Sequence, residues 1–117
     1  MRRKLYLVKA IVRIEKVPKI LKALTEEGFR GATIYRAEGM GGEGGVVVVR
    51  GEPIDALIPR VVIEVVVEGE DHVEKVVKIV MDNARTGMVG DGRIYVMPIG
   101  RSIRIRTGEE IISPELG

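Results

Sequence analysis

The chain of 117 residues contains no cysteine and no tryptophan, and aromatic residues make up only 3% of it. Without cysteine there is no disulfide framework, no thiol nucleophile and no thiolate metal site. So few aromatic side chains argue against a stacking platform for single-stranded nucleic acid. The formal net charge of +2 is also too even for binding nucleic acid by charge alone. A nucleic-acid partner is therefore not expected.

Long apolar runs are also missing. No stretch is long enough to span a membrane. The basic start Met1–Lys4 is not followed by the apolar core of a signal peptide, because Lys9 and Arg13 interrupt it. The length suits one core but not two. We therefore expect residues 1–117 to form a single cytoplasmic domain without membrane insertion.

Hydrophobic periodicity predicts four strands and two helices. Apolar residues recur at the strand or helix period, Gly28 follows the first helix as a stop, and Asp71 with Glu74 suggests a capping box for the second. The predicted strands cover 5–14, 29–38, 59–68 and 93–99, and the predicted helices cover 15–27 and 72–83. This order predicts an α+β, ferredoxin-like βαββαβ sandwich, an antiparallel sheet with two helices on one face. The uncovered face should expose Val and Ile residues, which favours contact with other subunits.

Two further segments lie outside the predicted βαββαβ elements. Five glycines fall among residues 39–45, and a broken β-prone run follows, so residues 39–58 are expected to form a long mobile loop with a partial hairpin. The glycine run is either a hinge or a plain flexible linker. Residues 103–117 are expected to form a short edge strand, Ile103–Arg106, and a tail.

Two elements are candidates for binding an anion. In residues 87–93, Gly87, Gly90 and Gly92 leave backbone N–H groups free to face an anion, and Arg93 adds a charged donor. The alternative is a helix cap followed by a turn. Arg104 and Arg106, two residues apart on a strand, would point to one face and could hold a polyphosphate between them. The alternative is an edge strand kept soluble by its charges.

Other candidates carry weaker signals. Glu43 is the only charged residue within the glycine run and could hold Mg²⁺ beside a nucleotide. His72 lies alone at a helix start, and we interpret it as exposed and structural, since one histidine without a second ligand is weak evidence for a metal site.

The two anion-binding elements resemble a known family. Ala84-Arg85-Thr86-Gly87, Gly90-Asp91-Gly92-Arg93-Ile94-Tyr95-Val96 and Ile103-Arg104-Ile105-Arg106-Thr107-Gly108-Glu109 closely resemble the C-terminal signatures of the PII signal-transduction family (GlnB/GlnK type). The similarity extends to Ala10-Ile11-Val12-Arg13, Gly28, Thr33 and Gly39-Met40-Gly41. It covers nearly the whole chain except the middle loop and the tail.

The resemblance implies a ferredoxin-like homotrimer that binds ATP or ADP between subunits. A mobile T-loop, here residues 39–58, would dock on an ammonium transporter or an enzyme of nitrogen or carbon metabolism. The B-loop, here 87–93, would hold the phosphates together with Arg104 and Arg106. Gly31 and Thr33 would line the base, and Gly41 would touch the ligand at the loop root. The nucleotide-binding residues implied are Gly31, Thr33, Gly41, Gly87, Gly90, Asp91, Gly92, Arg93, Arg104 and Arg106.

Some positions depart from the family pattern. Glu43 stands where the family has a glutamine that helps Mg²⁺ hold 2-oxoglutarate; a carboxylate there keeps the metal but repels a dianion, which argues against 2-oxoglutarate. Arg60 replaces a lysine that contacts this effector and retains some anion affinity. No tyrosine lies between Val46 and Ile58, so uridylylation is not expected. A non-enzymatic sensor is the main hypothesis, and the alternatives are a slow ATPase using Glu43 or a ferredoxin-like trimer that binds another small ligand or a metal.

Overall fold

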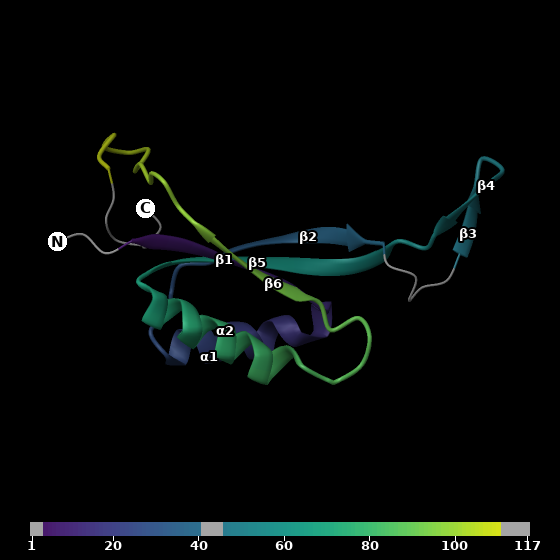
Figure 1. The fold of residues 1–117 in the computed structure, drawn as a ribbon, viewed down its shortest axis with the longest axis horizontal. Coiled ribbons are helices and arrows are strands. Elements are labelled where there is room, and N and C mark those ends of the chain that lie inside the picture. Colours follow the sequence, from purple (N-terminus) through teal and green to yellow (C-terminus); the bar gives the residue numbers. More distant parts are fainter. Residues whose placement is uncertain (1–3, 41–45, 111–117) are drawn as a thin grey trace.

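The computed structural model describes residues 4–40 and 46–110. Strands β2, β5, β1 and β6 form, in that order, one antiparallel sheet, and the α-helices lie together against one of its faces (Figure 1). The predicted α+β, ferredoxin-like fold is therefore confirmed. The elements are β1 (Leu5–Val12), a 3₁₀ turn (Ile14–Lys16), α1 (Val17–Glu26), β2 (Thr33–Gly39), β3 (Val46–Val49), β4 (Glu52–Asp55), β5 (Ile58–Glu68), α2 (Glu70–Ala84) and β6 (Arg93–Pro98).

The core lies between the sheet and the two helices. Alternate residues of β1 and β5 point toward the helices, as the two-residue period of a strand requires, and the apolar stripes of α1 and α2 cover them. Ile20 and Val76, at the centres of these stripes, are fully buried. The buried cluster consists of Val8, Ala10, Val12, Ile20, Leu24, Val61, Ile63, Val65, Val67, Val73, Val76, Val80 and Ala84.

The face of the sheet that the helices leave open is apolar, with a polar row across it. Leu7 and Ile11 of β1 pair there with Val66 and Val62 of β5, as the predicted Val and Ile pattern requires. Between them, Lys9 Nζ lies 3.9 Å from Glu64 Oε2, and the Tyr35 hydroxyl donates a hydrogen bond of 2.9 Å to the same oxygen. The open face is thus less uniformly apolar than expected.

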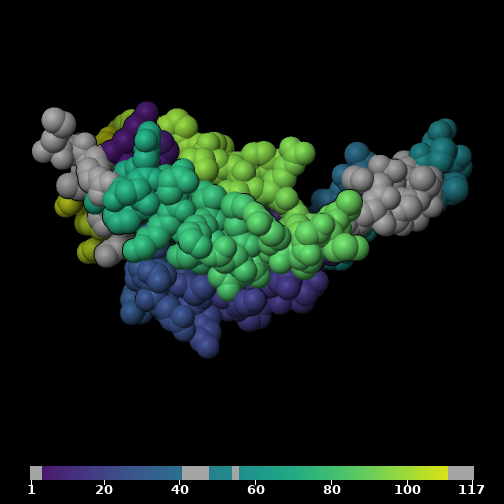
Figure 2. Space-filling model, turned by 60° about the horizontal axis from the view of Figure 1, so that its bottom comes forward, coloured from purple at the N-terminus to yellow at the C-terminus, as the bar shows by residue number. Residues whose placement is uncertain are grey.

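The segment between β2 and β5 contains a hairpin that projects from the body of the domain (Figures 1 and 2). β3 pairs with β4 through a turn at Arg50 and Gly51, whose φ angles of 49° and 81° are both positive. Two positive φ angles match the twist of hairpin strands. The partial hairpin predicted within residues 39–58 is confirmed. Residues 41–45, with the predicted sites Gly41 and Glu43, lie outside the described residues.

Two local predictions were wrong. α2 begins at Glu70, and Gly69, which has no side chain, is its N-cap residue, so Asp71 and Glu74 form no capping box. Ile103–Arg106 is not a strand: Ile103 bridges to Glu110, while the Gly108 N–H donates to the Arg104 carbonyl and closes a turn. Gly108 has a φ of 74°, a conformation that glycine adopts easily, and it reverses the chain where the Ile-Arg alternation predicted extension.

The helices of the described part of the chain include none that is both long and apolar enough to cross a membrane.

Candidate functional site

The loop between α2 and β6 is shaped by glycines at three positions. Gly87, Gly90 and Gly92 have φ angles of 85°, 101° and 103°, which side chains rarely tolerate. Gly92 also lies against β1: a Cβ atom there would sit 1.8 Å from the carbonyl oxygen of Ile11. The close approach fixes the end of the loop against the sheet.

Asp91 holds the first half of this loop from inside. Its Oδ2 accepts hydrogen bonds of 2.8 Å from the backbone N–H groups of Thr86 and Gly87, and its Oδ1 accepts one from the Thr86 hydroxyl. These bonds, those from Thr86 first, lower the pKa of Asp91 to about 2. The Asp91 carboxylate thus makes its hydrogen bonds within the loop. Asp91 would therefore contact an anion through its backbone N–H group and not through its side chain.

Arg13, which follows β1, holds the second half of the loop. Its Nη2 donates a hydrogen bond of 2.8 Å to the carbonyl oxygen of Val89, and its Nε lies 3.5 Å from Asp91 Oδ1. No sequence pattern predicts a role for Arg13 at this loop. It lies 76 residues from Val89 in the chain, so no local spacing could have linked the two.

The loop retains donors for an anion. The backbone N–H groups of Val89 and Gly90 donate no hydrogen bond among the described residues, and that of Asp91 only closes the turn at residues 89 and 90. The exposed side chain of Arg93 follows, at the start of β6. Beside the loop is a hollow of about 400 Å³ whose walls come from β1, α2 and β6 and are mostly apolar. Free N–H groups next to a guanidinium form a site suited to phosphate oxygens.

The second predicted element lies at the other end of β6. Arg93 pairs with Ile11, and Pro98, where β6 ends, pairs with Tyr6 at the opposite end of β1. Five steps along a strand separate these ends by roughly 16 Å. The turn containing Arg104 and Arg106 lies beyond Pro98, at the far end of the sheet from the Gly87–Arg93 loop (Figure 1). A single chain therefore does not bring the two elements together.

The guanidinium group of Arg104 has an N–H without an acceptor in the described part of the chain. Its Nε is buried and has no hydrogen-bond partner among the described residues, and Arg106 is exposed in the same turn. The turn is held by a hydrogen bond of 2.9 Å from the Arg104 N–H to the Glu109 carbonyl and by the ion pair of Arg101 with Glu110. A guanidinium N–H without an acceptor is a natural place for an anion.

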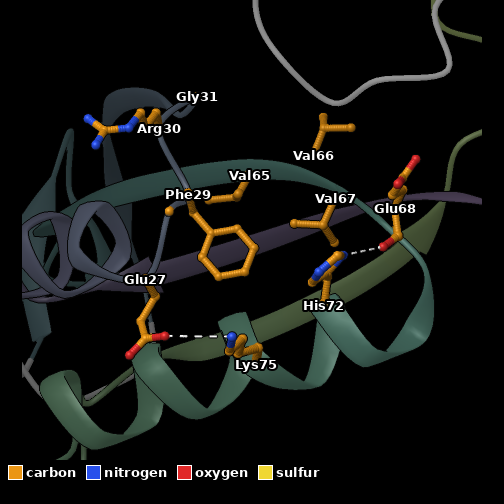
Figure 3. A pocket seen from close by; sticks show the side chains of 11 residues that line it. Glu27, Phe29, Arg30, Gly31, Val65, Val66, Val67, Glu68, His72 and Lys75 are labelled. Carbon is orange, nitrogen blue, oxygen red and sulfur yellow. Dashed lines mark hydrogen bonds and ion pairs between the residues drawn. The ribbon is translucent and has the colours of Figure 1, made fainter.

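Gly31 and Thr33 lie at the β2 edge of the sheet, opposite the edge formed by β6. The pairing of β2 with β5 starts at Thr33 and Glu64, so β2 covers no part of β5 beyond Glu64. A hollow of about 590 Å³ lies along that edge and is lined by Gly31 and by residues 65–68 (Figure 3). Of the two residues predicted to line the base, Gly31 lines this hollow and Thr33 does not, and the hollow is separate from the Gly87–Arg93 loop.

His72 forms part of the wall of this hollow. Its Nδ1 donates a hydrogen bond of 2.7 Å to the Glu68 carbonyl, and its ring meets Phe29 edge to face at 6.0 Å (Figure 3). The residue is partly buried, so its predicted exposure was wrong, but these contacts support the structural role. No cluster of three metal-binding side chains occurs within residues 4–40 and 46–110.

Arg60 lies at the root of the projecting hairpin. A Cβ atom on Gly39 would sit 3.6 Å from the Arg60 side chain, so Arg60 is next to the end of β2. Its Nη1 donates a hydrogen bond of 3.1 Å to the carbonyl of Pro59. The predicted effector residue is therefore near the hairpin.

Comparison with known proteins identifies relatives over almost the whole chain. The family model of the nitrogen regulatory protein P-II matches residues 5–109. A P-II homolog of Arabidopsis thaliana is 39% identical over 109 residues, 91% of this chain and 55% of that protein. P-II of Bradyrhizobium diazoefficiens is 40% identical over 104 residues, 87% of this chain and 92% of that protein. The chain spans about half the length of its relatives from Arabidopsis thaliana and Oryza sativa.

Comparison of the fold with solved structures also identifies a PII protein. The crystal structure of Arabidopsis thaliana PII bound to citrate matches with a TM-score of 0.77 and 34% identity, covering 98% of this chain and 94% of that one.

Proposed function

The chain belongs to the family of nitrogen regulatory proteins P-II, and from this premise we propose that it is a homotrimeric sensor that binds ATP or ADP between its subunits. It acts in the cytoplasm as a regulator and not as an enzyme. It signals its bound nucleotide to a protein partner, an ammonium transporter or an enzyme of nitrogen or carbon metabolism.

The observation that carries the proposal is the separation of the two anion-binding elements in one chain. The Gly87–Arg93 loop and the Arg104 turn lie at opposite ends of β6, roughly 16 Å or more apart. One polyphosphate contacts both only when a second copy brings its Arg104 to the loop of the first. The open apolar face of the sheet supports such an assembly, because a face of this kind usually meets other subunits.

Each part of the nucleotide then has a partner. The N–H groups of Gly90 and Asp91, together with Arg93, bind phosphate oxygens from one subunit, and Arg104 and Arg106 bind them from the next. The base lies at the edge of the sheet near Gly31 and Thr33, where a hollow is present. The roles of Gly41 and Glu43, including Mg²⁺ binding, concern residues outside the described ranges.

The projecting hairpin is the surface that meets the protein partner. Its turn lies far from the core, and the neighbouring Val48 and Val49 of β3 are both exposed, which leaves apolar surface for a partner. Arg60 and Gly39 lie at its root, so an effector held there could change the direction of the hairpin. A reduced response to 2-oxoglutarate is expected from Glu43.

Calorimetry with ATP, ADP and AMP in the presence of Mg²⁺ tests nucleotide binding directly. Dissociation constants above the millimolar range for all three nucleotides would refute the proposal.

Subunit mixing tests the position of the site. Arg93→Ala and Arg104→Ala should each abolish tight binding. When the two variants are mixed, denatured together and refolded into trimers, about one quarter of the sites combine an intact loop with an intact arginine, because a site between subunits draws its two halves from different copies. Recovery of binding in the mixture supports a shared site. A mixture as inactive as either variant would refute a site shared between the loop of one copy and Arg104 of another.

A further inference from the structure

We propose that Arg13 is a positioning residue that sets the Gly87–Arg93 loop in its binding shape before the ligand arrives. The inference rests on the proposed function, because the ligand it concerns is the phosphate chain of a nucleotide. The resemblance and the motifs assigned the loop itself but gave no role to Arg13.

The guanidinium of Arg13 joins both ends of the loop's second half. Nη2 donates to the Val89 carbonyl at 2.8 Å, and Nε faces Asp91 at 3.5 Å. Asp91 in turn accepts hydrogen bonds from the N–H groups of Thr86 and Gly87. Only the Val89 contact is a hydrogen bond: the Arg13 Nε is buried and makes no hydrogen bond among the described residues, so its contact with Asp91 is an ion pair. A planar guanidinium can keep both contacts at once, which a single ammonium group cannot do equally well.

Arg13 also determines which way one peptide group points. In a trans peptide, the C=O of one residue and the N–H of the next point in opposite directions, and no cis bond occurs in the described residues. The Val89 carbonyl points at Arg13, so the Gly90 N–H points away from it, out of the loop. Gly90 makes no backbone hydrogen bond there among the described residues. Arg13 thus presents a donor to the ligand without touching the ligand.

The base of this contact is fixed by the sheet. Arg13 directly follows Val12, which is buried and pairs with Val61 of β5, and it directly precedes the 3₁₀ turn at Ile14. The Arg13 side chain is only 22% exposed, and its charge faces Asp91. Because Asp91 balances the charge of Arg13 and Val89 takes the Nη2 hydrogen bond, we place the effect of Arg13 in the shape of the loop and not in a direct contact with the phosphates. If folding already orders the loop, ligand binding does not carry the entropic cost of ordering it.

The test compares Arg13→Met, Arg13→Lys and the control Lys78→Met. Lys78→Met removes the same charge on α2, where Lys78 pairs with Asp82 on the surface. Two readouts are needed: hydrogen exchange of the Thr86 and Gly87 amides without ligand, and the affinity for ATP and ADP. For Arg13→Met we expect about tenfold faster exchange and about tenfold weaker binding, with Arg13→Lys in between and the control unchanged.

The readouts separate the alternatives. Unchanged exchange in Arg13→Met overturns the positioning role, and so does weaker binding with unchanged exchange, which would mean that Arg13 touches the nucleotide. A general loss of stability would speed exchange across the whole sheet, not only at the loop. If Arg13→Met does not fold, Arg13→Lys must show the faster exchange, or the inference is wrong. If the wild-type protein binds no nucleotide, the proposed function fails, while exchange at Thr86 and Gly87 still decides the role of Arg13.

Discussion

Gly92 offers the sharpest test of how the loop is fixed to the sheet. A methyl group there faces two separate costs. The φ of 103° disfavours any side chain, and the new Cβ would lie 1.8 Å from the Ile11 carbonyl oxygen, far inside contact distance. The first cost is about 1–2 kcal/mol. The second, forcing backbone away from backbone, adds about 1–3 kcal/mol.

Two other glycines allow these costs to be separated. Gly87 has a φ of 85° but open space around its Cβ, so Gly87→Ala carries the first cost alone. Gly100 has neither a positive φ nor a neighbour within 4 Å, so Gly100→Ala should be neutral. Gly92→Ala should therefore lower the free energy of unfolding by about 2–5 kcal/mol, a large share of the roughly 5–15 kcal/mol of a typical domain.

Urea denaturation at a fixed protomer concentration measures the series, because the stability of an oligomer depends on concentration. With an ordinary denaturant slope, the midpoint for Gly92→Ala should fall by roughly 1–2 M relative to the wild type, and that for Gly87→Ala by less, because it carries only the first cost. Equal midpoints for the two variants would refute the close approach of the loop to β1.

Three further predictions concern other parts of the domain. Because the pKa of Asp91 is lowered to about 2, its contribution to stability should be complete above the ordinary Asp pKa and disappear as the pH falls toward 2; in acid titrations Asp91→Asn should lack this component. Val76→Ala should destabilise the domain by about 2–3 kcal/mol because Val76 is fully buried, whereas Val48→Ala, on the exposed hairpin, should leave the melting temperature unchanged. Tyr35→Phe should cost about 1 kcal/mol in urea denaturation by removing the hydrogen bond to Glu64, and no loss would mean that water replaces the phenol.

The predicted and observed elements agree where local patterns are strong. α2 has its apolar residues at the helical period, and the structure buries Val73, Val76 and Val80 as that period requires. The observed ends of an element differ from the predicted ones where a contact with a residue outside that element sets them. β2, expected from Phe29, begins at Thr33, because Phe29 packs instead against the core and against His72.

In the candidate site too, local sequence patterns indicate some features and miss others. The glycines, Arg93 and the two arginines near the C-terminus are evident as residue types at short spacings. Their arrangement is not: the expected strand at Ile103–Arg106 is a turn, and it lies at the far end of β6 from the loop. Arg13 belongs to a segment that resembles the family, but nothing in its sequence neighbourhood indicates the two contacts that it makes with the loop.

By itself, the sequence determined the class of fold, the position of the helices, the glycine-shaped loop and the family resemblance, because each is encoded in a repeat or a motif within a few consecutive residues. Only the tertiary structure decided which distant residues meet. The register between β1 and β6 fixes Gly92 against Ile11 and brings Arg13 to Val89, and the length of β6 keeps the two anion-binding elements apart in one chain. Register and strand direction depend on the packing of the whole sheet, so no local pattern in the chain reports them.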